Sequence, residues 1–122
     1  GQTTSQVLSS GYIDILSNKA AMQKDPQNTF LHEIGHQIDF LYLGGYPVTR
    51  TYYNASGQQE WQTIYAAEKD SIASFSKNSS YNVYTAYEAF AEATGQYFLA
   101  PDWLQSNCPL SYAYITKVVA SF

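Results

Sequence analysis

Residues 31–40 read LHEIGHQIDF and contain both histidines of the chain, His32 and His36. On an α-helix, residues four positions apart lie one turn above each other on the same face, so both imidazoles can reach one metal ion. Glu33 points into a neighbouring sector of such a helix, where its carboxylate can face a metal-bound water without binding the metal. The stretch therefore predicts a helix that supplies two metal ligands and a general base.

The helix that carries these histidines has recognisable ends. Asp25-Pro26 offers a capping side chain followed by proline at the first helical position, and Gly44-Gly45 is typical of a helix stop. A helix is therefore predicted over about 27–43. The alternative is that the pattern arose by chance and that both histidines are ordinary, partly exposed helix residues.

The rest of the chain predicts a mostly helical domain with one strand. GYIDIL (11–16) is a short apolar run after a glycine, which favours a strand. Further helices are predicted over about 58–75, 85–99 and 110–121. Three acidic residues of the helix over 58–75 are interpreted as surface residues of an ordinary charged helix: Glu60, Glu68 and Asp70.

A third metal ligand must be a carboxylate, because catalytic zinc sites use three protein ligands and no third histidine exists. The stretch YEAFAEATGQYF (87–98) places Glu88 and Glu92 four apart among apolar residues. Buried carboxylates need a cation or hydrogen-bond donors, whereas a solvated acidic stripe is the alternative. Spacing does not decide which glutamate binds the metal; the other can accept a hydrogen bond from a ligand histidine. Asp39, one turn beyond His36, competes for that hydrogen bond.

Composition narrows the class of protein. The 122 residues carry a net charge of −4 and are 45% hydrophobic, with no basic stripe and no apolar run of the ~20 residues that a membrane span needs. Nucleic acid is therefore not expected as a partner, nor is insertion into a membrane. The single cysteine, Cys108, excludes an internal disulfide, and the Ser-, Thr-, Asn- and Gln-rich polar residues indicate a secreted protein. The glycosylation patterns at Asn54 and Asn78 are interpreted as chance matches.

Two motifs together resemble a known family. HEIGHQID (32–39) combined with Y-x6-E-A-F-A-E-A (81–93) is similar to the catalytic domain of anthrax lethal factor and the related secreted Pro-Pro endopeptidases. These proteins are zinc metallopeptidases of the gluzincin type, and the resemblance covers roughly residues 30–98. It implies the zinc ligands His32, His36 and Glu88.

The resemblance also implies roles for three further residues. Glu33 would be the catalytic base, Glu92 a carboxylate that supports a ligand histidine, and Tyr81 a tyrosine that faces the metal. A phenol can donate a hydrogen bond to the negative charge that develops on a peptide carbonyl, and its pKa near 10 keeps it protonated at neutral pH. Tyr84 and Tyr87 are rivals for this role in the same stretch.

Together with the resemblance, these observations predict a small, mostly helical, zincin-like α+β domain over residues 1–122, with one short strand or a small sheet beside the helix that carries the histidines. Peptide substrates could pair along the strand at 11–16, and the alternative is that it is a plain core strand. The predicted function is that of a monomeric, secreted, zinc-dependent endopeptidase in which Glu33 activates a zinc-bound water for attack on a peptide or protein substrate. The alternative is a catalytically inactive zinc-binding module.

Overall fold

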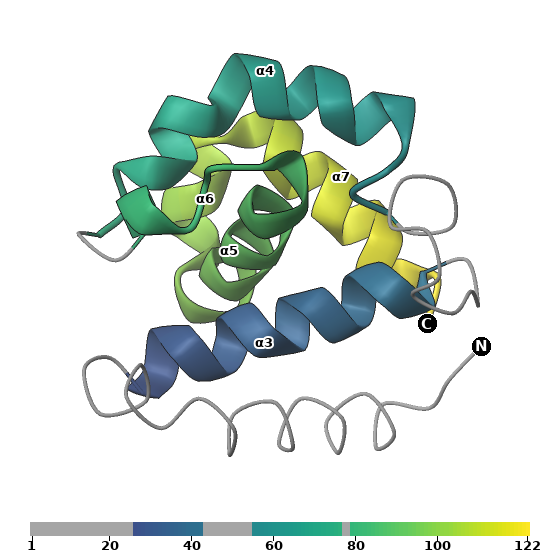
Figure 1. The fold of residues 1–122 in the computed structure, drawn as a ribbon, viewed down its shortest axis with the longest axis horizontal. Coiled ribbons are helices and arrows are strands. Elements are labelled where there is room, and N and C mark those ends of the chain that lie inside the picture. Colours follow the sequence, from purple (N-terminus) through teal and green to yellow (C-terminus); the bar gives the residue numbers. More distant parts are fainter. Residues whose placement is uncertain (1–25, 43–54, 77–78) are drawn as a thin grey trace.

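The computed structural model describes residues 26–42, 55–76 and 79–122. Helix α5 lies in the centre of these residues, with α3 along one side and α4 across the other, while α6 and α7 pack behind (Figure 1). The described residues form five α-helices and one 3-10 turn: α3 (Pro26–Leu41), α4 (Gln59–Ala73), η1 (Ser79–Tyr81), α5 (Ala86–Leu99), α6 (Pro101–Asn107) and α7 (Pro109–Ala120).

The prediction of an α+β domain is wrong. Residues 26–42, 55–76 and 79–122 contain no strand and form a small helical domain, in which α3 packs against α5 instead of a sheet. The strand predicted at 11–16 lies outside the described residues. Among the described residues, the helix α5 supplies the contact along α3 that a strand was expected to provide.

Proline and threonine set the helix boundaries. Helix α3 spans Pro26–Leu41, where the sequence predicted a helix over about 27–43. The Oγ1 atom of Thr85 accepts a hydrogen bond from the backbone N–H of Glu88 at 3.1 Å and so caps α5. Pro101 follows the end of α5 at Leu99 and begins the short helix α6, because proline is well suited to the first helical position.

The hydrophobic core surrounds α5, with Ile34 and Ile38 from α3 and aromatic rings from α4 and α7. The ring of Trp61 meets that of Phe90 edge-on at a centroid distance of 5.2 Å and stacks on that of Tyr114 at 5.7 Å. Trp61 Nε1 also donates a hydrogen bond to the carbonyl oxygen of Ala86 at 2.7 Å, at the start of α5. These contacts fix the beginning of α5, which carries Glu88, relative to the rest of the domain. None of the helices in the described parts of the chain is both long and apolar enough to cross a lipid bilayer.

The interpretation of Glu68 as a surface residue is wrong. Its side chain is buried, and its carboxylate accepts hydrogen bonds from the backbone N–H groups of Leu110 at 3.0 Å and Ser111 at 2.8 Å. The hydroxyl of Ser111 donates a third, also at 2.8 Å. A carboxylate from α4 therefore caps the first turn of α7, where unpaired N–H groups favour a negative charge.

We expect Glu68→Ala to lower the free energy of unfolding by about 1–3 kcal/mol, because the donors at the start of α7 would stay buried without a partner. Urea unfolding followed by circular dichroism measures this change. Glu60→Ala is the matched control, since Glu60 lies on the same helix but is exposed and pairs only with exposed Lys117 among the contacts described. Equal losses in the two variants would contradict the capping role.

Candidate metal centre

The site depends on an unusually close approach of α3 and α5. A Cβ atom built at Gly35 on α3 would lie 2.6 Å from the carbonyl oxygen and 2.8 Å from the Cα atom of Ala91 on α5. Real Cβ atoms do not approach backbone atoms so closely, so only glycine allows the two helices to cross at this distance. The crossing brings the side chains of α3 within reach of the first turn of α5.

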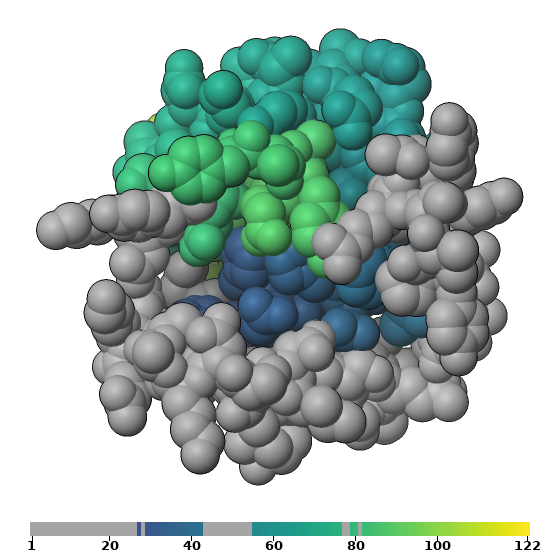
Figure 2. Space-filling model, in the orientation of Figure 1, coloured from purple at the N-terminus to yellow at the C-terminus, as the bar shows by residue number. Residues whose placement is uncertain are grey.

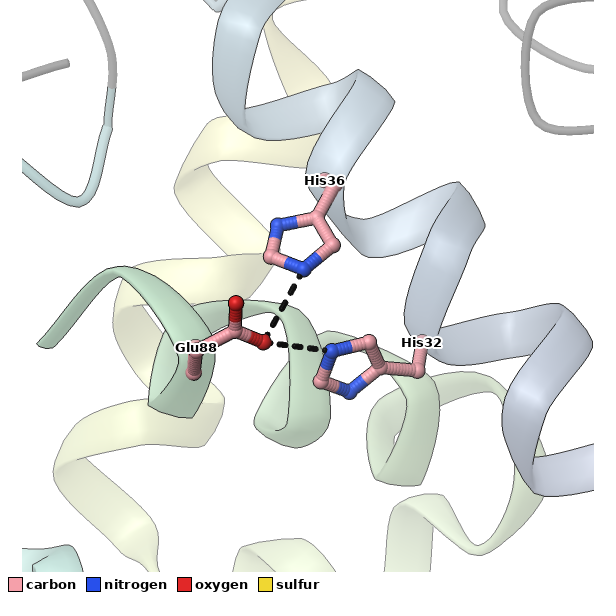
Figure 3. A group of neighbouring side chains, drawn as sticks. All are labelled: His32, His36 and Glu88. Carbon is pink, nitrogen blue, oxygen red and sulfur yellow. Dashed lines mark hydrogen bonds and ion pairs between the residues drawn. The ribbon is translucent and has the colours of Figure 1, made fainter. Parts of the chain in front are cut away.

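Three side chains converge beside this crossing. His32 and His36 project from α3 toward Glu88 on α5 (Figure 3). Oxygen Oε2 of Glu88 lies 2.9 Å from Nε2 of His32 and 3.2 Å from Nε2 of His36. Both histidines are buried, whereas the Glu88 side chain is 38% exposed. The site therefore opens to solvent on the side of the glutamate, and Figure 2 shows atoms of α3 and of the region around the start of α5 meeting at the centre of one face.

This donor set fits a metal ion. One ligand atom from each of His32, His36 and Glu88 lies within 4.8 Å of the others. Two imidazoles and a carboxylate are one of the ligand combinations of catalytic zinc sites, which hold the ion with three protein groups. Both rings direct their Nε2 atom at the same carboxylate oxygen, Oε2 of Glu88. A cation shared by these three atoms could take the place of the two hydrogen bonds.

Hydrogen bonds set the charge of the site when no metal is bound. Burial opposes protonation of His32, but its hydrogen bonds to Glu88 and Glu92 outweigh burial and raise the pKa of His32 to about 9. Hydrogen bonds from His32 and His36 hold the pKa of the Glu88 carboxyl well below its usual range. Without a metal, His32 therefore carries at neutral pH a proton that a metal ion would have to displace.

We expect zinc to raise the melting temperature more at pH 9 than at pH 6.5. In the metal-free protein, the raised pKa of His32 adds to the free energy of unfolding. This contribution is fully present below pH 6.5 and is lost as pH rises through about 9. The lowered pKa of Glu88 adds a contribution that is lost only as pH falls below 4.5, so it is constant over this range. Zinc competes with the His32 proton, so its own stabilising effect grows with pH. Thermal unfolding in chelator-buffered zinc tests this, and a zinc increment that stays flat or shrinks toward pH 9 would contradict it.

Glu92 contacts the second ring nitrogen of His32, Nδ1, which does not face Glu88. Its Oε1 atom is 2.8 Å from Nδ1 of His32, and its side chain is fully buried. Asp39, the competing candidate, is also fully buried, and its Oδ1 atom accepts a hydrogen bond from the backbone N–H of Ser56 at 2.6 Å. The structure therefore brings Glu92 to the histidine and brings Asp39 to the turn that precedes α4.

The structure describes fewer contacts for the two predicted catalytic residues, Glu33 and Tyr81, than for the predicted metal ligands. Glu33 lies between the two histidines on α3 and is half-buried. Tyr81 belongs to η1, but its side chain lies outside what the structure describes, so its role stays a prediction. Of its rivals, Tyr84 is 75% exposed, and the ring of Tyr87 stacks on that of His36 at a centroid distance of 4.4 Å.

The sequence did not point to the stacking of Tyr87 or to two polar residues near Glu92. The tyrosine immediately precedes Glu88, so its side of α5 faces α3, and this position was the available signal. Ser79 and Asn82 both donate hydrogen bonds to Glu92. Nothing in a loop rich in serine and asparagine distinguishes them from ordinary loop residues.

Comparison with known families adds an independent observation. Residues 6–119 match the model of the glucose-regulated metallo-peptidase M90 family. A search of curated proteins and a search of solved structures gave no match. The family match supports a metallopeptidase and the metal ion that such an enzyme needs, but it does not extend to the lethal-factor-like subfamily that the motifs resemble. The chain belongs to the glucose-regulated metallo-peptidase M90 family.

Proposed function

We propose that this protein is a zinc-dependent endopeptidase of the gluzincin type, the class to which its lethal-factor-like motifs point. The observation that carries the proposal is the convergence of His32 and His36 from one helix and Glu88 from another, with their ligand atoms within 4.8 Å of one another. Glu33 lies between the two histidines, as a general base beside such a metal should. The family match supports peptide-bond hydrolysis as the class of reaction.

Each residue has a defined task in this mechanism. Bound zinc would supply Lewis-acid chemistry, polarising the scissile carbonyl and lowering the pKa of water. Glu33 would take the proton from the attacking water and pass it to the leaving amine. Glu92 would hold the His32 ring through Nδ1, and the Tyr81 hydroxyl would donate a hydrogen bond to the oxygen that becomes negative.

The substrate and setting belong to the same proposal. A peptide or protein chain would approach at Glu88, because its side chain is partly exposed whereas both histidines are buried. A composition poor in charged residues and rich in serine, threonine, asparagine and glutamine supports an extracellular setting, and we propose that the protein acts there as a monomer.

Metal analysis followed by cleavage-site profiling on a peptide library tests the proposal. We expect about one zinc ion per chain and cleavage within peptides that a chelator abolishes and added zinc restores. A protein that holds zinc at full occupancy but cleaves no peptide would instead be an inactive zinc-binding module, and the proposal would be wrong.

A further inference from the structure

A buried hydrogen-bond network surrounds Glu92. Its Oε1 atom lies 2.8 Å from Nδ1 of His32 and accepts a hydrogen bond from Nδ2 of Asn82 at 3.2 Å. Its Oε2 atom accepts a hydrogen bond from the hydroxyl of Ser79 at 2.5 Å. Ser79 and Glu92 are both fully buried. One carboxylate therefore joins a metal-site histidine to the segment 79–82.

The donor and acceptor roles in this network are set by chemistry. An ionised carboxylate only accepts hydrogen bonds, so the single hydroxyl proton of Ser79 points to Glu92. The hydroxyl oxygen of Ser79 must then accept from its other two partners, Nε2 of Gln96 at 3.3 Å and the hydroxyl of Ser76 at 3.1 Å. Gln96 is held in turn by a hydrogen bond from Nε2 to the carbonyl oxygen of Ile72 at 3.0 Å. Ser79 therefore has a defined orientation, with its only donor directed at the carboxylate.

The network determines which nitrogen of His32 is available to a metal. Once His32 has lost its second proton, as metal binding requires, an anionic Glu92 favours the tautomer in which Nδ1 keeps the remaining proton and Nε2, on the side of Glu88, is the nitrogen left for a metal. Because Ser79 donates to Oε2 of Glu92 and Asn82 donates to Oε1, the carboxylate cannot rotate away from the ring without breaking a hydrogen bond. The imidazole is thus oriented by residues that do not touch the metal site themselves.

The same contacts also hold the turn that contains Tyr81. The carbonyl oxygen of Ser79 accepts a hydrogen bond from the backbone N–H of Asn82 at 3.0 Å, which closes the turn around Tyr81. Both ends of this turn direct a side chain to Glu92. The position of the turn and the orientation of His32 therefore depend on one carboxylate.

We propose that Ser79 is a positioning residue that, through Glu92, couples the orientation of His32 to the order of the turn containing Tyr81. The consequence for catalysis rests on the proposed function, because it requires zinc at His32 and a role for Tyr81. The coupling predicts that metal binding and the rigidity of the 79–82 turn depend on each other. Loss of the Ser79 hydroxyl weakens both.

The test measures zinc affinity, by competition with a chromophoric chelator, and hydrogen exchange of the 79–82 backbone with and without zinc. For Ser79→Ala, we expect about tenfold weaker zinc binding, the low end of the range for partners of ligand histidines. In the wild-type protein, zinc should slow exchange in the turn, whereas in Ser79→Ala exchange should be fast and independent of zinc. Asn82→Ala, at a half-buried position, should also weaken zinc binding and speed hydrogen exchange in the turn, but by less than Ser79→Ala.

Ser111→Ala is the matched control, because it also removes a fully buried serine hydroxyl that donates to a buried glutamate. That glutamate is Glu68, which is not among the residues that hydrogen-bond to His32 or Glu92 in the network described above. We expect it to lower stability while leaving zinc affinity within about twofold and exchange in the turn unchanged. Equal losses of zinc affinity in Ser111→Ala and Ser79→Ala would overturn the proposal. If Ser79→Ala does not fold, Asn82→Ala decides, and wild-type behaviour in that variant overturns it.

These measurements need no turnover, so they separate this inference from the proposed function. A protein that binds zinc and shows the expected shifts but cleaves no peptide contradicts the endopeptidase and leaves the coupling intact. A protein that cleaves peptides while Ser79→Ala binds zinc normally contradicts the coupling alone. A wild-type chain that binds no metal overturns both.

Discussion

Replacing Glu33 with glutamine should lower kcat by about 10²–10⁴-fold, the usual contribution of a general base, while zinc content stays at that of the wild type. Glutamine has nearly the same size and polarity as glutamate but cannot accept the proton of the attacking water. Glu33 is not one of the three residues whose ligand atoms converge, so its replacement should leave the metal ligands in place. Steady-state peptide cleavage together with metal analysis of the same preparation measures both quantities.

Two further variants define what the Glu33 result means. Glu60→Gln neutralises an exposed carboxylate on α4 and should leave turnover and zinc unchanged. Glu88→Gln should lose zinc and turnover together, because a neutral amide is a much poorer ligand than a carboxylate. If Glu33→Gln loses its metal, or cleaves peptides at a near-normal rate, Glu33 is not the base.

Helical periodicity carries information on the local part of the candidate site only. Residues four apart on one helix must share a face, so the spacing of His32 and His36 was enough to place both rings together. Choosing between Glu88 and Glu92 was beyond spacing alone, because both lie on the same face of α5. The distinction depends on how α5 crosses α3. This crossing brings the Glu88 carboxylate to Nε2 of His32 and the Glu92 carboxylate to Nδ1.

The parts of the fold that sequence reasoning missed are those set by packing between distant segments. Glu68 resembles a surface residue in its own helix, and only the arrival of α7 buries it. Pro101 is consistent with a helix end and a helix start, and the chain uses it as both. The predicted sheet followed from a resemblance and from one apolar run, whereas the described residues cover α3 with the helix α5. Local patterns carried no information on these partners.

The close helix crossing leads to the second large expected effect. Gly35→Ala should lower the free energy of unfolding by about 3 kcal/mol or more and weaken zinc binding by more than tenfold. The added methyl group would meet backbone atoms of Ala91 at 2.6 and 2.8 Å, and a backbone cannot rotate out of the way as a side chain can. The helices must therefore separate, which moves His32 and His36 away from Glu88. Alanine's better helix propensity returns only about 1 kcal/mol, too little to offset the clash.

Gly95→Ala on α5 is the matched control for this effect. A Cβ atom there would lie 3.4 Å from backbone atoms of Leu31 and His32, at the boundary of ordinary van der Waals contact. We therefore expect this variant to fold with near wild-type or slightly higher stability and to bind zinc normally, since the gain in helix propensity outweighs a small adjustment. Urea unfolding and chelator competition on both variants provide the comparison. A Gly35→Ala protein as stable and as tightly zinc-binding as Gly95→Ala would show that the approach of α3 and α5 does not hold the ligands together.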